Sequence, residues 1–273
     1  MNKFLYSFLL ISVANAETFT IAVLPDPQVY TRYHPDIFQA QIDWVLDNQN
    51  NLNIKAVVNE GDNVHFGVTD HNQWQTVSNI MGHLDGILPY VMTVGNHDMG
   101  TTDMPTANNR DTSMYNTYFP SSRYQNYSWY GEHFGNTNDN YYIHFEVDRI
   151  PFIIISLEFG PTNEMLNWAN SVALAHSSSW IILVTHAYLN SDNEYWDMDG
   201  PLGLNRYGIQ GGNAGLEIWQ KFVSQHRNVF MVLSGHLHSQ QIDECGGYLV
   251  SEGVNGNAVH QIFSNFQSYT NGG

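Results

Sequence analysis

The chain has 273 residues, of which 42% are hydrophobic and 14% aromatic; 9 Lys plus Arg stand against 26 Asp plus Glu, for a formal net charge of −17. This composition excludes an intrinsically disordered chain, which has few aromatic residues, and argues against a partner such as duplex nucleic acid, which attracts concentrated positive charge. The single cysteine, Cys245, excludes an intramolecular disulfide framework and a zinc site built from several thiolates.

Residues 1–16 have the pattern of a secretory signal peptide. Lys3 precedes an apolar run over residues 4–13, and the small residues Ala14 and Ala16 stand where a cleavage site requires them. A membrane anchor is disfavoured, because a run of about ten apolar residues is half the length that spans a bilayer. We therefore expect cleavage after Ala16 and a secreted or periplasmic mature chain with no membrane span.

Short apolar runs alternate with helical patterns over the first hundred residues. Strands are predicted at residues 19–24, 54–58 and 90–94. Two intervening helices, one starting near Pro35 and one stopping near Gly86, are indicated by apolar residues that recur with helical spacing: Phe38, Ile42, Val45, Leu46, Trp74, Val77, Met81 and Leu84. This alternation of strands and helices predicts a sheet with parallel crossovers.

Residues 99–139 interrupt the alternation. They are rich in Asn, Thr, Ser and Gly, and so long a segment without periodicity is usually functional. The aromatic side chains within residues 115–142 either line a substrate pocket or hold the segment against the domain, and both interpretations are open.

The second half of the chain returns to alternating elements. Helices are expected from about Thr162 and around Leu216 to Val223, and strands at residues 141–147, 152–157, 180–184, 229–233, 240–250 and 257–264. Because there is no internal repeat and no linker, we interpret residues 17–273 as one domain.

Five predicted strands are each followed at once by residues that can bind a metal. In chain order these residues are Asp26-Pro27-Gln28, Gly61-Asp62-Asn63, Gly95-Asn96-His97-Asp98, Thr185-His186 and Gly235-His236-Leu237-His238. Ligands gather at the carboxyl ends of strands in α/β sheets, so the five clusters are expected to meet at one edge. One such residue alone is often only a turn residue, whereas five clusters of this kind favour a metal site.

The residue types indicate two divalent cations. Asp and Asn supply oxygen, His supplies nitrogen and no thiolate is present, a mixture that suits Mn, Fe, Zn or a similar ion. Two cations about 4 Å apart need a bridging carboxylate, and Asp62 is the candidate. Such a pair neutralises phosphate oxygens and acidifies a bound water to a hydroxide nucleophile, which points to the hydrolysis of phosphate esters.

The ordered motifs resemble those of the calcineurin-like metallophosphoesterase superfamily over about residues 19–267. The resemblance implies an α/β fold, a four-layer α/β/β/α sandwich of two mixed β-sheets with the metal site at the carboxyl ends of the strands. It implies one cation bound by Asp26, Asp62 and His238. A second cation is implied at Asp62, Asn96, His186 and His236.

The resemblance also implies roles for three neighbouring residues. His97 corresponds to the histidine that contacts the scissile phosphate and protonates the leaving oxygen, and Asp98 is expected to orient and charge it. Gln28 stands where the family usually has histidine, and because an amide is the weaker ligand, the first cation is expected to bind less tightly. The nearby His65 is interpreted as a solvated loop histidine.

The sequence therefore predicts an exported, metal-dependent hydrolase that acts on a small phosphate ester, either a monoester or a diester. The alternative is a catalytically weakened binding module that recognises glycan or peptide through the aromatic residues 115–142. Members of the family usually continue with another strand after a Gly-Gly turn, whereas this chain ends at Gly272-Gly273, which leaves truncation of the domain open. The oligomeric state is not predicted.

Overall fold

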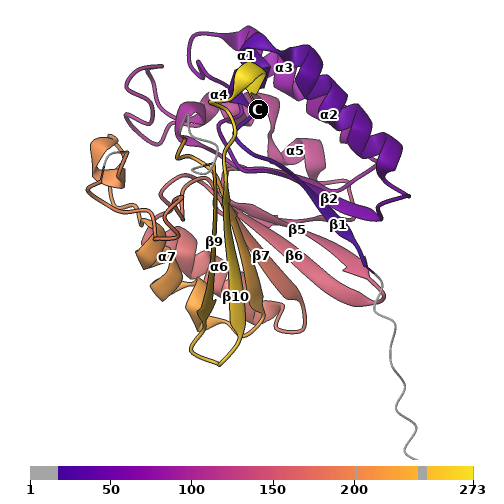
Figure 1. Cartoon of the computed structure of the whole chain (residues 1–273), viewed down its shortest axis with the longest axis vertical. Helices are drawn as coiled ribbons and strands as arrows, with labels where there is room; N and C mark the ends of the chain where they lie inside the picture. Colours follow the sequence, from indigo (N-terminus) through magenta and orange to yellow (C-terminus); the bar gives the residue numbers. More distant parts are fainter. Residues whose placement is uncertain (1–17, 201, 239–244, 273) are drawn as a thin grey trace, which may run out of the picture.

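Two β-sheets lie face to face and carry helices on their outer sides (Figure 1). The structure is a computed structural model of the chain and describes residues 18–200, 202–238 and 245–272. Among these residues, no helix combines the length and the apolar character that crossing a membrane requires. The predicted signal peptide, residues 1–16, lies outside the described residues.

The smaller sheet consists of parallel strands in the order β1-β2-β3, namely β1 (Thr20–Leu24), β2 (Ile54–Asn59) and β3 (Tyr90–Met92). Its crossovers contain α1 (Gln28–Tyr33), α2 (Pro35–Asn48), α3 (His71–Met81) and the short helix η1 (Gly82–Leu84). Pro35 starts α2, where its missing N–H removes no helical hydrogen bond, and the Asp70 side chain caps α3 by accepting from Asn72 N. The predicted parallel crossovers are thus confirmed, whereas α1 was not predicted.

The larger sheet has the order β4-β5-β6-β7-β8-β10-β9. Its strands are β4 (Tyr130–His133), β5 (Tyr141–Val147), β6 (Ile150–Leu157), β7 (Trp180–Thr185), β8 (Val229–Ser234), β9 (Gly246–Glu252) and β10 (Ala258–Ser264). The central strands β6, β7, β8 and β10 are parallel, and the pairs toward the two edges are antiparallel. The crossovers carry α6 (Asn163–Ala175) and α7 (Gly215–Lys221), followed by the one-turn helix η4 (Val223–Gln225). Four carboxyl ends therefore point to one edge of this sheet.

Alternating side chains divide the interior into layers. Ala56, Val58 and Val91 of the smaller sheet belong to the apolar cluster between the sheets, together with Ile154 and Ile182 of the larger one. Their strand neighbours point the other way, because successive side chains of a strand face opposite sides, and pack under the helices. The predicted four-layer α/β/β/α sandwich is confirmed, but only the larger sheet is mixed, because the pairs within the smaller sheet are all parallel.

The segment that interrupts the alternation, residues 99–139, is built into the domain. It contains α4 (Ser113–Tyr118), α5 (Ser121–Tyr124) and β4. Tyr115, Phe119 and Tyr124 are completely buried, and the Tyr115 ring packs edge-on against Trp74 of α3. This packing supports the interpretation that the rings hold the segment against the domain. Because they are buried, these three rings are not available to contact a glycan or peptide.

Candidate metal centre

The polar residues that follow the strands meet at one edge of the two sheets. Asp26 follows β1, Asp62 follows β2 and His186 follows β7, and each offers a ligand atom within 4.8 Å of the others. All three side chains are buried. Residues separated by up to 160 positions in the sequence therefore form one group of metal-binding type.

His186 Nε2 lies at the centre of a larger group. Its neighbours are Asn96 Oδ1 at 3.1 Å, Asp62 Oδ1 at 3.3 Å and His236 Nδ1 at 3.3 Å. Asn96 belongs to the short helix η2 (Asn96–Asp98) after β3, and His236 follows β8. This group joins one predicted residue from each of four strand ends.

The N–H groups of Asn96, His186 and His236 make hydrogen bonds that point away from this group. His186 Nδ1 lies 2.9 Å from the carbonyl oxygen of Glu60, which can only accept, so this nitrogen carries the ring proton of the neutral imidazole. The Asn96 amide donates its hydrogen to Thr106 Oγ1 and turns its oxygen toward His186. His236 Nε2 faces the Leu202 carbonyl oxygen and the Tyr207 hydroxyl, at 3.4 and 3.3 Å.

It follows that lone pairs of two imidazole nitrogens, one amide oxygen and one carboxylate oxygen point at the same place. Four acceptors without a hydrogen between them repel one another, and a divalent cation resolves that repulsion. Burial alone lowers the pKa of His186, but the carboxylates of Asp62 and Asp26 outweigh it and raise this pKa to about 10. The surroundings thus strongly favour a positive charge at Nε2, which a metal ion supplies in place of a proton.

Asp26 adds a second feature that fits a cation. Its Oδ2 accepts a hydrogen bond from His236 N at 2.9 Å, whereas Oδ1 is buried and has no hydrogen-bond partner among the described residues. Burial raises the pKa of this carboxyl to about 8. A buried carboxylate oxygen without a partner is costly unless a cation binds it, so Asp26 is suited to be a ligand.

The backbone at these strand ends is strained. Asp26, Asp62 and His236 have φ values of 43°, 51° and 76°, in the left-handed region that side chains with a Cβ rarely adopt. Two glycines allow the close approach of the turns: a Cβ on Gly95 would lie 2.2 Å from Asp62 N, and one on Gly235 would lie 2.3 Å from Asp26 Oδ2. Strain of this kind clusters at functional sites.

Asp62 connects this group to a second one. Its Oδ1 faces His186, and its Oδ2 accepts a hydrogen bond from Gln28 Nε2 at 3.0 Å. We call Asn96, His186 and His236 the inner group, and Gln28, His65 and His238 the outer group. The metal-binding group at Asp26 and Asp62 contains His186 but not His238, and we place His238 in the outer group because its partner Ser268 adjoins Gln267, which contacts Gln28. With one oxygen toward each group, Asp62 has the geometry of a bridging carboxylate.

Apart from Asp62, the hydrogen-bond partners of the outer group are neutral side chains. Gln28 Oε1 lies 2.9 Å from His65 Nδ1, and Gln28 Nε2 also donates to Gln267 Oε1 at 2.8 Å. His238 is exposed, and its Nδ1 lies 3.0 Å from Ser268 Oγ. His65, interpreted from the sequence as a loop histidine, is half-buried and stacks on His97 with ring centroids 5.1 Å apart.

His97 and Asp98 differ in their surroundings from what the family resemblance implied. His97 N donates to Asp62 Oδ1, and its ring Nδ1 faces the His65 carbonyl oxygen at 2.8 Å. The buried Asp98 carboxylate instead accepts from Asn63 N at 2.9 Å and Gly95 N at 2.8 Å. Asp98 therefore fixes the turns that carry Asp62 and Asn96, because backbone N–H groups there need a buried acceptor, and the His65 carbonyl is what orients the His97 ring.

Sequence reasoning missed several residues that contact the site, and four of them contribute side chains near the predicted histidines or Gln28. Gln267 and Ser268 follow β10, and a strand parallel to β8 must end at the same edge, so this signal was present in the predicted strand 257–264. Phe159 follows β6 and packs its ring against His186 and His236, with centroids 5.8 and 5.1 Å away. Tyr207 lies in a loop without periodicity, and no pattern indicated it.

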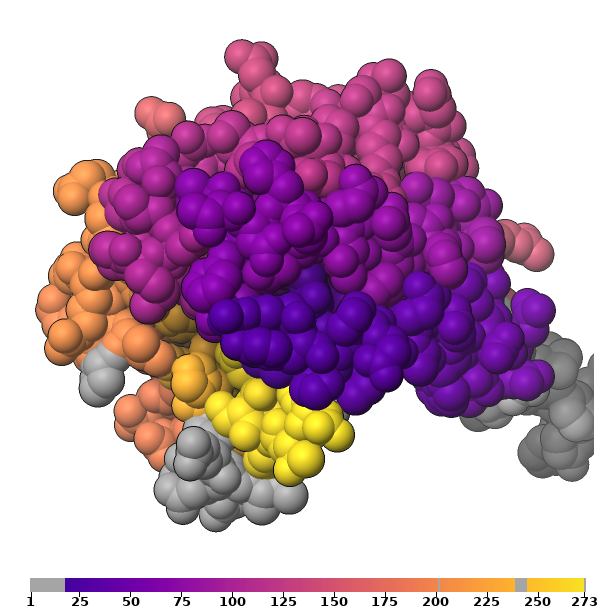
Figure 2. Space-filling model, turned by 90° about the horizontal axis from the view of Figure 1, so that it is seen from above, coloured from indigo at the N-terminus to yellow at the C-terminus, as the bar shows by residue number. Residues whose placement is uncertain are grey.

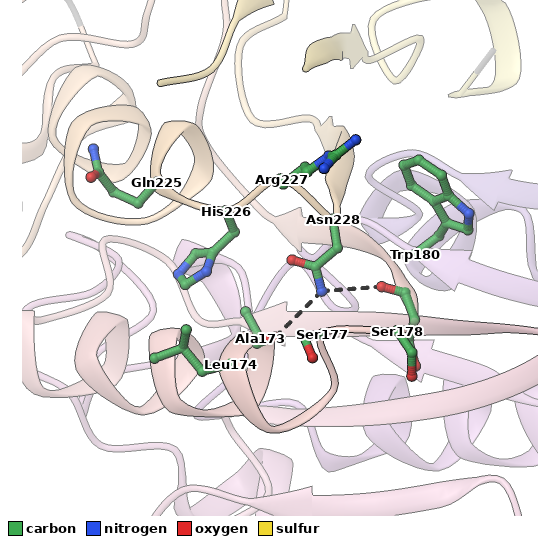
Figure 3. Close-up of a pocket in the computed structure, with 10 residues that line it drawn as sticks. Ala173, Leu174, Ser177, Ser178, Trp180, Gln225, His226, Arg227 and Asn228 are labelled. Carbon is green, nitrogen blue, oxygen red and sulfur yellow. Dashed lines mark hydrogen bonds between the residues drawn. The ribbon is translucent and has the colours of Figure 1, made fainter. Parts of the chain in front are cut away.

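The pocket drawn in Figure 3 is a different place on the molecule. It is lined by Ser179 and Trp180 at the start of β7 and by Asn228 just before β8, whereas the metal-binding residues follow the ends of these strands. The Asn228 amide already donates to the backbone carbonyl oxygens of Ala173, His176 and Ser179. The metal-binding group therefore does not open into this pocket.

The comparisons with known proteins agree with this geometry. The model of the family described as calcineurin-like phosphoesterase matches residues 19–240. YvnB of Bacillus subtilis (strain 168) is 31% identical over 263 residues, which are 94% of this chain and 18% of that protein, so the chain spans less than a fifth of this relative. A dimetal phosphatase from Danio rerio has the same fold, with a TM-score of 0.52 and 14% identity over 90% of this chain and 86% of that one.

Proposed function

The chain belongs to the calcineurin-like phosphoesterase family, and on that basis we propose that it hydrolyses small phosphate esters with two divalent cations bound at the strand ends. The observation that carries the proposal is the convergence of four lone pairs from Asp62, Asn96, His186 and His236. A proton on His186 Nε2 could satisfy only some of these atoms, whereas a divalent cation can be bound by all four.

The inner cation is assigned to Asp62, Asn96, His186 and His236. The outer cation is assigned to Asp26, Asp62 and His238, with Gln28 beside it. When bound, such cations supply positive charge to the phosphate oxygens and lower the pKa of a bound water. The buried carboxylates of Asp26 and Asp62 balance that charge, which supports the choice of divalent ions.

His97 is proposed to donate a proton to the leaving oxygen of the ester. Because its Nδ1 faces the His65 carbonyl, Nε2 is the nitrogen that can exchange a proton with substrate. The backbone bond from His97 N to Asp62 Oδ1 holds the His97 backbone beside the carboxylate that would bridge the cations.

Residues 17–273 are proposed to form a phosphoesterase domain that is exported after removal of residues 1–16. The net charge of −17 disfavours long polyanions as substrates, but a small phosphate ester meets the local positive charge of the bound cations. The inner and outer groups do not distinguish monoesters from diesters, so both substrate classes belong in the test.

The test is hydrolysis of 4-nitrophenyl phosphate and bis(4-nitrophenyl) phosphate by the purified chain, first stripped with a chelator and then supplied with Mn²⁺, Zn²⁺ or Fe²⁺. We expect no turnover after stripping and recovery with at least one cation. The substrate turned over faster assigns the class. Absence of turnover of both esters with every cation would refute the proposal, as would turnover unaffected by stripping.

A further inference from the structure

The segment after β10, residues 265–268, reaches the outer group from the far end of the chain. Because β10 is parallel to β8, it ends at the same edge as the strand that carries His236 and His238. Gln267 N donates to Asn265 Oδ1 at 3.1 Å, which turns the segment across this edge. Figure 2 looks onto this side and shows the C-terminal residues in yellow against the N-terminal elements in indigo, which agrees with the packing of Gly272 on Tyr30 of α1.

Gln267 completes the hydrogen bonds of Gln28. The amide nitrogen of Gln28 has two hydrogens, and it gives one to Asp62 Oδ2 at 3.0 Å and the other to Gln267 Oε1 at 2.8 Å. With His65 on its oxygen, the buried Gln28 amide has a single satisfied orientation. Without Gln267, a hydrogen of a buried amide loses its partner and the side chain is free to turn away from Asp62.

Ser268 has the corresponding contact with His238. Its Oγ lies 3.0 Å from His238 Nδ1, which leaves Nε2 as the nitrogen for a cation. Since His238 is exposed, its ring has few packing contacts to hold it in one rotamer. One hydrogen bond to a ring nitrogen is the usual means of fixing the tautomer and direction of a metal-binding histidine.

We propose that Gln267 and Ser268 are positioning residues of the outer cation site, Gln267 by holding Gln28 against Asp62 and Ser268 by orienting His238. The proposal rests on the proposed function, because it assumes that cations bind to these groups. The outer site is accordingly sensitive to changes in residues 265–268 that leave the inner site intact.

The experiment is a titration of the stripped full chain with Mn²⁺ alone, followed by the electron paramagnetic resonance of free Mn²⁺. Gln267→Leu keeps the approximate size of the side chain but cannot accept, and Ser268→Ala removes the hydroxyl. We expect each to weaken the weaker of two Mn²⁺ binding steps by about tenfold, without changing the tighter step. Gln267→Glu keeps the acceptor oxygen and is expected to bind Mn²⁺ at least as tightly as the parent chain.

Thr270→Ala is the matched control, since Thr270 is exposed in the same segment, in the short helix η6 (Thr270–Gly272). It should leave both binding steps unchanged. If Gln267→Leu and Ser268→Ala also leave both steps unchanged while the parent chain binds two Mn²⁺ and turns over ester, the positioning role is refuted and the proposed function stands. If the parent chain binds one Mn²⁺ or none, the positioning role is refuted, and the ester assay with Mn²⁺, Zn²⁺ and Fe²⁺ decides the proposed function separately.

Discussion

The inner and outer groups share Asp62 but are built differently. The side chains of Asn96, His186 and His236 in the inner group are buried, and each contacts a polar partner, which is a backbone carbonyl oxygen for the two histidines. In the outer group, His238 is exposed and Gln28 is held by the side chains of His65 and Gln267. Preorganised buried ligands bind a cation at a lower ordering cost, so we expect cations bound to the two groups to differ in affinity.

The largest expected effect comes from the residue that the two groups share. Asp62→Asn removes the negative charge between them, and we expect turnover of 4-nitrophenyl phosphate to fall by about a thousandfold or more. Metal analysis of the same preparation should show loss of bound cation. Unchanged turnover with a full complement of metal would break the comparison, because Asp62 would then bridge nothing.

His97→Ala separates proton transfer from cation binding. Neither group contains His97 as a ligand, so we expect both Mn²⁺ binding steps to persist. Turnover of an alkyl phosphate, whose leaving oxygen needs a proton, should fall by about a hundredfold, and that of 4-nitrophenyl phosphate should fall less. Loss of metal from this variant would contradict the role given to the ring.

Gly235→Ala tests the strained turn between β8 and His236. The added Cβ would meet Asp26 Oδ2 at 2.3 Å, and we expect the free energy of unfolding to fall by about 2 kcal/mol, measured by urea denaturation. Gly246→Ala is the control, since the nearest atom to its Cβ, Phe263 O, lies at an ordinary 3.7 Å. Equal stability of the two variants would show that the turn is not tightly packed.

The smallest effect is expected at Gln28. Gln28→Ala removes a neutral side chain from the outer group, so we expect the weaker Mn²⁺ step to weaken by about tenfold and the tighter step to stay as it is. Calorimetric titration distinguishes the two steps. A change in the tighter Mn²⁺ binding step would mean that Gln28 also affects the inner group, against what its contacts suggest.

Most residues of the candidate metal centre could be predicted from the sequence, because ligands gather at strand ends and this rule needs only the positions and directions of the strands. Asp26, Asp62, Asn96, His186 and His236 each follow a short apolar run, and the structure brings them together. The parallel crossovers also followed from the alternation of strands and helices, whereas the four-layer sandwich was implied by the family resemblance.

The rest depended on pairings that the local sequence does not encode. The side-by-side placement of β10 and β8 decides that Gln267 and Ser268 reach the site, yet these strands are separated by β9 in the chain. Asp98 accepts hydrogen bonds from Asn63 N and Gly95 N, and the local sequence does not indicate that these backbone N–H groups lie beside it. The sequence left open whether the aromatic residues 115–142 line a pocket or hold the segment against the domain. Burial decides this for Tyr115 and Tyr124, which lie in the core.

The most direct test of two cations at the strand ends is anomalous diffraction at the manganese edge from crystals of the chain grown with Mn²⁺. The account predicts two anomalous peaks about 4 Å apart on either side of Asp62, the stronger one among Asn96, His186 and His236 and the weaker one toward Asp26 and His238. No peak near Asp62, or a stronger peak on the His238 side, would contradict it.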